Sequence, residues 1–189
     1  MEHRTATPVK EKETAENSAV SNYRQSIELL NRAVGLEIAT SMQYMYFHIH
    51  CEDAGYRYLA RMFRNISITE MRHIELFADR ILYLKGDVDM NPAFRTKQIT
   101  GVTEMLALSR QLERSTIDHY NTWAKACSEG LDAASQSLFR TILQEEEQHA
   151  DTFDTEHQNM EDYGKEYLAL QSMAQSRAEN KHKVTDWEE

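Results

Sequence analysis

The chain has 189 residues, which suits a single domain with a core of ordinary size. It contains 41% hydrophobic and 28% charged residues, a balance that excludes a membrane protein and a disordered acidic tail. Its net charge of −10 at pH 7 disfavours a general nucleic-acid binder, because the phosphate backbone would repel it.

The chain has only 6 Gly and 2 Pro, whereas these residues make up roughly 12% of an average protein. Turns should therefore be few and elements long, which favours an all-α fold over an all-β one. No apolar run approaches the roughly 20 residues of a membrane span, and residues 1–20 lack the apolar stretch of a secretory signal. We therefore predict a soluble, cytoplasmic protein with no nucleic-acid or membrane partner.

The N-terminal residues 1–21 are polar and mixed in charge, and we expect them to form a mobile tail. Apolar residues then recur every three or four positions, which is typical of amphipathic helices. Glycines and aspartates interrupt this pattern and divide it into elements. The predicted long helices cover residues 22–52, 56–85, 101–129 and 133–162.

The segment 86–100, which contains Pro92, is a long connection for a compact domain. About 15 residues at ~3.3 Å each span ~50 Å, enough to run the length of a 30-residue helix. The other two connections are short, so the pattern predicts a four-helix bundle with one long crossover between its second and third helices. A short fifth helix is expected over 165–174, which completes a domain of residues 22–175. Residues 176–189 are expected to fray.

Two of the predicted helices contain the motif Glu-x-x-His, in Glu70–His73 and in Glu146–His149. Side chains three residues apart lie on one face of a helix, so both can reach one metal ion. The motif alone is weak evidence, because about one such pair is expected by chance in a chain with this many Glu and His residues.

The spacing of two further glutamates is more specific. Glu37 and Glu113 lie among apolar residues of the first and third helices, and each is 33 residues before the Glu of the next motif. The midpoints of these intervals fall at the two short helix breaks. In an antiparallel hairpin, residues equidistant from the turn lie at the same height. The two halves of the bundle therefore repeat each other at an offset of 76 residues, and four carboxylates and two imidazoles should converge.

Four buried carboxylates need a counter-charge, because burying them alone would be prohibitive. Two divalent cations supply it, and oxygen-rich ligation with one imidazole per metal suits iron or manganese. This is the ligand pattern of di-iron carboxylate bundles in general. For any single Glu, a solvated helix face is the more ordinary interpretation. The flanking Glu145 and Glu147 are expected to face the cavity or solvent rather than the metals.

Several stretches of the sequence resemble the bacterioferritin family, and together they span about residues 25–175. They include one segment from each long helix and one from the predicted fifth helix. These segments are LLNRAVGLEIATSMQY (29–44), EMRHIELFADRILYLKGDV (70–88), EMLALSRQLE (104–113), ILQEEEQH (142–149) and YGKEYLALQ (163–171).

The resemblance implies a ferroxidase that stores iron in a hollow shell of 24 subunits, built from two-fold dimers. Fe²⁺ and O₂ or H₂O₂ would be its substrates, and two iron ions would bind per subunit. In each half of the bundle, one Glu and one His would hold one iron ion. Two further glutamates would bridge the two ions. The implied ligands are Glu37 and His73 for one iron, Glu113 and His149 for the other, and Glu70 and Glu146 as bridges.

The same resemblance assigns two further residues. Met71 occupies the place of the methionine that ligates haem b at the two-fold dimer interface, one from each subunit. The simpler interpretation is that Met71 is an adaptable interface residue. Tyr44 occupies the place of a tyrosine thought to lend an electron near the di-iron site. Tyr120 is its counterpart in the repeat, and a core tyrosine is the favoured interpretation there.

The chain departs from the family at three positions. Asn65 and Thr69 stand where the family has the His and Asp of an inner-surface iron site, and Thr152 replaces a tryptophan that follows the last ligand His. We therefore expect the routes by which electrons and iron move between the site and the cavity to differ from those in the family.

Other functions fit the same bundle. A 12-subunit, Dps-like protector that consumes peroxide keeps the di-iron site, although such cages generally lack a fifth helix. A non-enzymatic haem-binding or scaffold bundle would lack iron-dependent oxygen uptake. A di-iron oxygenase or a manganese catalase usually has a longer chain.

Overall fold

A computed structural model describes the backbone of residues 23–185 and the side chains of residues 23–174. The tail predicted for residues 1–21 lies outside this range. The described residues form helices and connections, with no strand among them. The helices are α2 (Arg24–Asp53), α3 (Arg57–Tyr83), α4 (Val102–Glu129) and α5 (Ala133–Thr185).

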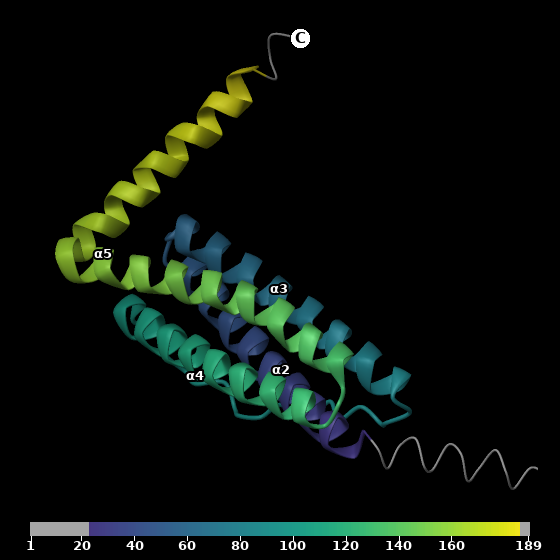
Figure 1. Cartoon of the computed structure of the whole chain (residues 1–189). Helices are drawn as coiled ribbons and strands as arrows, with labels where there is room; N and C mark the ends of the chain where they lie inside the picture. The colour runs from purple at the N-terminus through teal and green to yellow at the C-terminus, as the bar shows by residue number, and fades with distance from the viewer. Residues whose placement is uncertain (1–22, 186–189) are drawn as a thin grey trace, which may run out of the picture.

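The four helices form the predicted bundle (Figure 1). Tight turns join α2 to α3 and α4 to α5, and each of these hairpins packs along its length. Contacts of α3 with α5 and of α2 with α4 close the bundle. The prediction of an all-α four-helix bundle with one long crossover is therefore confirmed. None of the described helices is long and apolar enough to cross a membrane.

The crossover between α3 and α4 is tied to the surface of α2. The Ala93 amide donates to the carbonyl of Gly35 over 2.8 Å. The amide of Lys97 donates to the side chain of Gln43, whose own amide group donates back to the carbonyl of Lys97. A Cβ at Gly35 would lie 3.1 Å from the carbonyl oxygen of Asn91, so a small residue lets the crossover approach closely. These contacts hold the crossover along α2 as the chain returns to the other end of the bundle. The helices α3 and α4 therefore run in the same direction.

Two apolar clusters fill the bundle, one toward each end. Phe63 and Phe153 belong to the cluster near the α2–α3 turn, and Phe77 and Phe139 belong to the cluster near the α4–α5 turn. Both clusters draw on all four helices, so each end of the bundle has its own core. The layer between them brings together buried carboxylates and imidazoles from all four helices.

The predicted short fifth helix is not a separate element in the described part of the chain. Residues 165–174 belong to α5, which bends at Gly164 and continues as helix to Thr185, past the end expected near residue 174. Only Gly164, with φ 56° and ψ −139°, leaves helical geometry inside α5. The glycine therefore acts as a kink within a helix rather than as its terminus, and the segment beyond it points away from the bundle (Figure 1).

Tyr167 anchors the first turns after the kink. Its hydroxyl donates to the buried Glu156 over 2.6 Å and accepts from the side chains of Asn159 and Gln171. Tyr58 of α3 donates to the other oxygen of Glu156. This network holds the bend against the end of the bundle.

Replacing Gly164 by alanine should destabilise the protein by roughly 1–3 kcal/mol, because its backbone conformation is essentially restricted to glycine. Urea denaturation followed by circular dichroism measures this change. Gly130→Ala is the control, since Gly130 has an ordinary φ of −79° and should gain about 0.4–1 kcal/mol. Equal effects of the two substitutions would contradict the assignment of Gly164 as a strained kink.

Candidate metal centre

The polar layer between the two apolar clusters contains the six residues that the sequence spacing singled out. One comes from α2, one from α4, and a Glu-x-x-His pair comes from each of α3 and α5. The four carboxylates are at most 2% exposed, and only one imidazole is more open, at 12%. The six residues are Glu37, Glu70, His73, Glu113, Glu146 and His149.

The hairpin geometry explains why these residues share one level. Glu37 and Glu70 are equidistant from the α2–α3 turn, and Glu113 and Glu146 are equidistant from the α4–α5 turn. Within each Glu-x-x-His pair, the three-residue spacing directs both side chains into the bundle. The two imidazole rings lie with their centroids 6.2 Å apart and nearly parallel.

Glu70 and Glu146 each contact both histidines. The Glu70 oxygens lie 3.0 Å from Nδ1 of His73 and 3.1 Å from Nδ1 of His149, one oxygen to each ring. The Glu146 oxygens lie 3.0 Å and 3.4 Å from the same two nitrogens. Two carboxylates that divide their oxygens between two imidazoles have the arrangement of bridging ligands.

The ligand atoms of the layer form two overlapping groups. Each group lies within 4.8 Å and could hold one metal ion. The first contains Glu37 and His73, the second contains Glu113 and His149, and both contain Glu70 and Glu146. Each group thus offers carboxylate oxygens with one imidazole nitrogen, a donor set that suits iron or manganese.

The charges of the layer are unbalanced without cations. Burial raises the pKa of Glu37, Glu70 and Glu113, and neighbouring carboxylates raise each of them further. Burial alone lowers the pKa of His149, but its contacts with Glu146 and Glu70 outweigh this and raise the pKa to about 10. The layer therefore retains protons where a metal would replace them.

Several buried polar atoms of this layer have ion-pair contacts at most and form no hydrogen bond of suitable geometry. They are one oxygen each of Glu70, Glu113 and Glu146, and Nδ1 of His149. Such orphaned atoms are costly in a protein interior unless another group satisfies them. All four are atoms of the two ligand groups, so the residues fit a pair of metal ions.

Two buried tyrosines bind Glu113 and Glu37, the glutamates that belong to only one of the two ligand groups. The Tyr44 hydroxyl donates to Oε1 of Glu113, and the Tyr120 hydroxyl donates to Oε1 of Glu37. Burial raises the pKa of both phenols well above the usual value, and the nearby carboxylates add to this, so both stay neutral donors. Tyr120 was expected to be a core tyrosine with a satisfied hydroxyl, and it is fully buried with its hydroxyl bound to Glu37. Its contact is equivalent to that of Tyr44, its counterpart in the 76-residue repeat.

Glu145 contradicts the expectation that it faces away from the site. Its carboxylate lies 3.3 Å from Nε2 of His73 and accepts from the guanidinium of Arg72. Burial alone raises the pKa of Glu145, but the hydrogen bonds from Arg72 and His73 lower it below its usual value. A carboxylate on the outer ring nitrogen orients the imidazole and keeps Nδ1 toward the centre.

The remaining positions singled out by the sequence lie outside the layer. Met71 is 43% exposed on α3, and Ile68, one turn before it, is exposed to a similar degree. The hydroxyls of Thr69 and Thr152 donate to carbonyls of their own helices. Neither threonine takes part in the two ligand groups.

The family model of the ferritin-like domain matches residues 27–163 of the chain. The bacterioferritin of Desulfovibrio desulfuricans is 32% identical over 143 residues, which cover 76% of this chain and 80% of that protein. The chain belongs to the bacterioferritin family. The bacterioferritin of Streptomyces coelicolor is 34% identical over 131 residues, which cover 69% of this chain and 78% of that protein.

Solved bacterioferritins share the fold. The crystal structure of the D. desulfuricans protein, described with its diiron site in different catalytic states, has a TM-score of 0.79 and 30% identity, covering 81% of this chain and 90% of that one. The Rhodobacter capsulatus bacterioferritin, described with a metal-free dinuclear site and a heme iron, has a TM-score of 0.75 and 28% identity, covering 78% and 92%.

Divalent cations should stabilise the metal-free protein through this layer. At a Mn²⁺ concentration 100 times the dissociation constant, linkage predicts about 2.7 kcal/mol, or several degrees in Tm, measured by thermal denaturation. Glu146→Ala should abolish the Mn²⁺-dependent rise, because it removes a carboxylate that both ligand groups share. Glu147→Ala, one residue away and exposed, should retain the rise. A Tm of the unaltered protein that does not change with added Mn²⁺ would contradict a metal centre in this layer.

Proposed function

We propose that this protein is a ferroxidase that stores iron. It oxidises Fe²⁺ to Fe³⁺ with O₂ or H₂O₂ at the buried layer, and Fe³⁺ passes to a hydrated mineral inside a protein shell. The observation that carries this proposal is the pair of overlapping ligand groups that share Glu70 and Glu146. Membership of the bacterioferritin family supports it.

In this proposal each substrate ion has its own ligands. Glu37 and His73 bind one Fe²⁺, and Glu113 and His149 bind the other. The bridging carboxylates hold the two ions next to each other. Two one-electron donors then meet a two-electron oxidant: two Fe²⁺, one H₂O₂ and two protons yield two Fe³⁺ and two water molecules. The pairing matters because a single Fe²⁺ would leave a radical.

The surrounding residues support this chemistry in three ways. The apolar clusters on both sides exclude bulk water from the layer, which strengthens its electrostatic interactions. Glu145 orients His73 from outside. Tyr44 and Tyr120 donate to the terminal carboxylates, which leaves the second oxygen of each free for a metal. Tyr44, as in the family resemblance, is the proposed electron donor beside the site.

We further propose a shell of 24 subunits built from two-fold dimers. The helical segment after Gly164 corresponds in sequence to the short fifth helix of the larger cages, and the network around Tyr167 ties it to the bundle. This segment favours the larger cage over a 12-subunit one. Sedimentation velocity of the purified protein distinguishes the two assemblies.

Anaerobic titration of the metal-free protein should show two Fe²⁺ bound per subunit, and added H₂O₂ should oxidise both rapidly. Glu70→Ala should slow this oxidation by at least about 100-fold, because even outer partners of metal ligands are worth 10–100-fold. The visible absorbance of Fe³⁺ in stopped flow measures the rate. Glu75→Ala, exposed on the same helix, is the control. Absence of rapid oxidation in the unaltered protein would favour a non-enzymatic haem-binding or scaffold bundle.

Haem b is the second cofactor that we propose, shared by Met71 of two subunits at the dimer axis. The exposed thioether and the exposed Ile68 beside it fit a flat, apolar ligand at a subunit surface. Bound haem would supply a one-electron carrier whose potential is raised by thioether ligation.

Replacing Met71 by leucine should remove the spectrum of haem with two methionine ligands after reconstitution of the protein with haem. The absorption and magnetic circular dichroism spectra measure this loss. Met90→Leu changes a more exposed methionine, on the crossover, and should leave the spectrum intact. A Met71→Leu protein with an unchanged haem spectrum would refute the axial role.

A further inference from the structure

Tyr120 connects the metal centre to a second aromatic ring that the ferroxidase chemistry does not use. Its hydroxyl donates to Glu37, and its ring centroid lies 5.7 Å from that of Trp123, one turn along α4. Trp123 in turn stacks on His119, with centroids 5.1 Å apart and planes 24° from parallel. The side chains of α4 thus form a continuous path of contacts outward from Glu37.

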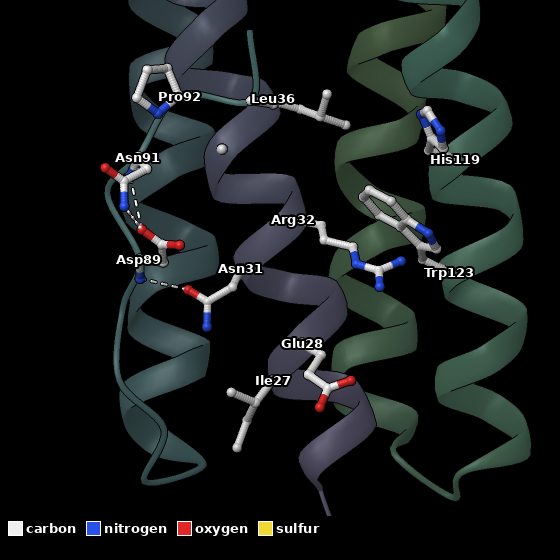
Figure 2. Close-up of a pocket in the computed structure, with 12 residues that line it drawn as sticks. Ile27, Glu28, Asn31, Arg32, Leu36, Asp89, Asn91, Pro92, His119 and Trp123 are labelled. Atoms are coloured by element: carbon white, nitrogen blue, oxygen red, sulfur yellow. Dashed lines mark hydrogen bonds between the residues drawn. The ribbon is translucent and has the colours of Figure 1, made fainter.

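Trp123, itself largely buried, lies against a surface groove at the far end of this path. It lines a groove of about 760 Å³ that lies beside α2, together with His119, Arg32, Leu36 and residues of the crossover. Figure 2 shows Trp123 and His119 on α4, with Arg32 of α2 extending toward the indole. Tyr120 is fully buried, whereas Trp123 retains 8% exposure. An oxidised Trp123 would therefore lie at a solvent boundary.

The equivalent tyrosine of the other half has no such exit. Tyr44 donates to Glu113 just as Tyr120 donates to Glu37, but its ring neighbours among the described residues are Phe63 and Phe153. Phenylalanine is much harder to oxidise by one electron than tyrosine or tryptophan. Among the described residues, Tyr120 is the one of the two tyrosines whose ring directly contacts another readily oxidised ring.

We propose that Tyr120 and Trp123 form a relay that carries an oxidising equivalent from the metal centre to the surface groove when H₂O₂ reacts with a centre holding one Fe²⁺. This proposal rests on the proposed ferroxidase function. With two Fe²⁺ bound, the two electrons required come from iron. With one bound, the second electron must come from the protein. Tyr44, the electron donor proposed above, and Tyr120 each donate to a proposed ligand, but only the ring of Tyr120 contacts a tryptophan to which the oxidising equivalent can pass.

Atoms, charge and electrons are all accounted for in the steps of the relay. The phenol of Tyr120 loses an electron to the peroxide and its proton to the carboxylate of Glu37, along their hydrogen bond. An electron from Trp123 and the same proton then restore the phenol. The indole cation of Trp123 releases its N–H proton to water in the groove. In sum, H₂O₂, Fe²⁺, one proton and the indole of Trp123 give Fe³⁺, two water molecules and a neutral indole radical.

Freeze-quench electron paramagnetic resonance tests the relay. The full-length protein is loaded anaerobically with one Fe²⁺ per subunit, mixed with H₂O₂ and frozen within milliseconds to seconds. Trp187, the other tryptophan of the chain, is replaced by phenylalanine throughout, so that any tryptophan radical belongs to Trp123. We expect a tryptophan radical with one Fe²⁺ per subunit and its loss with two.

Three variants separate the parts of the path. Trp123→Phe should replace the tryptophan radical by a tyrosyl radical that persists at Tyr120. Tyr120→Phe should lose the tryptophan radical, while circular dichroism and Fe²⁺ titration show that the variant folds and binds metal. Tyr44→Phe should retain the tryptophan radical. Tyr163→Phe, an exposed tyrosine on α5, is the control.

A tryptophan radical that survives Tyr120→Phe, or that disappears in Tyr44→Phe, would overturn the proposal. So would an unaltered protein that oxidises two Fe²⁺ rapidly but forms no tryptophan radical with one, and this result would leave the ferroxidase function standing. A protein that oxidises no Fe²⁺ under either condition would overturn both the ferroxidase function and the relay.

Discussion

The burial of four carboxylates in a dry layer is the constraint on which the rest of this structure depends. Their mutual repulsion and desolvation cannot be offset by two histidines alone. The protonation of the layer and its orphaned oxygens are two expressions of the same imbalance. Cations resolve both at once. The fold therefore places an electrostatically unbalanced layer between two apolar clusters, a setting in which metal binding is coupled to folding.

Internal symmetry made much of this centre predictable. Two halves with the same spacing must place equivalent residues at equivalent heights, so Glu37 and Glu113 could be identified although neither belongs to a motif. The helix limits followed from glycines and from the apolar period. Gly164 was predicted to end a helix, because a glycine in sequence does not distinguish a terminus from a kink. Only the conformation of the residues after it decides between them.

The features that the sequence did not reveal depend on how one helix packs against another. Glu145 reaches His73 because α3 and α5 pack closely at this level, and helical spacing alone turns it away from Glu146. Tyr120 and Trp123 both lie on α4, but the groove beside Trp123 is formed by α4 together with α2 and the crossover. Spacing along one helix predicts which residues share a face, but the neighbour of that face is set by packing.

The division of the core into two clusters has a consequence for how ions gain access. Because each end of the bundle has its own apolar core, a local opening of the middle layer would leave both cores packed. Entry of an ion would then require opening of that layer alone, without unfolding of the bundle.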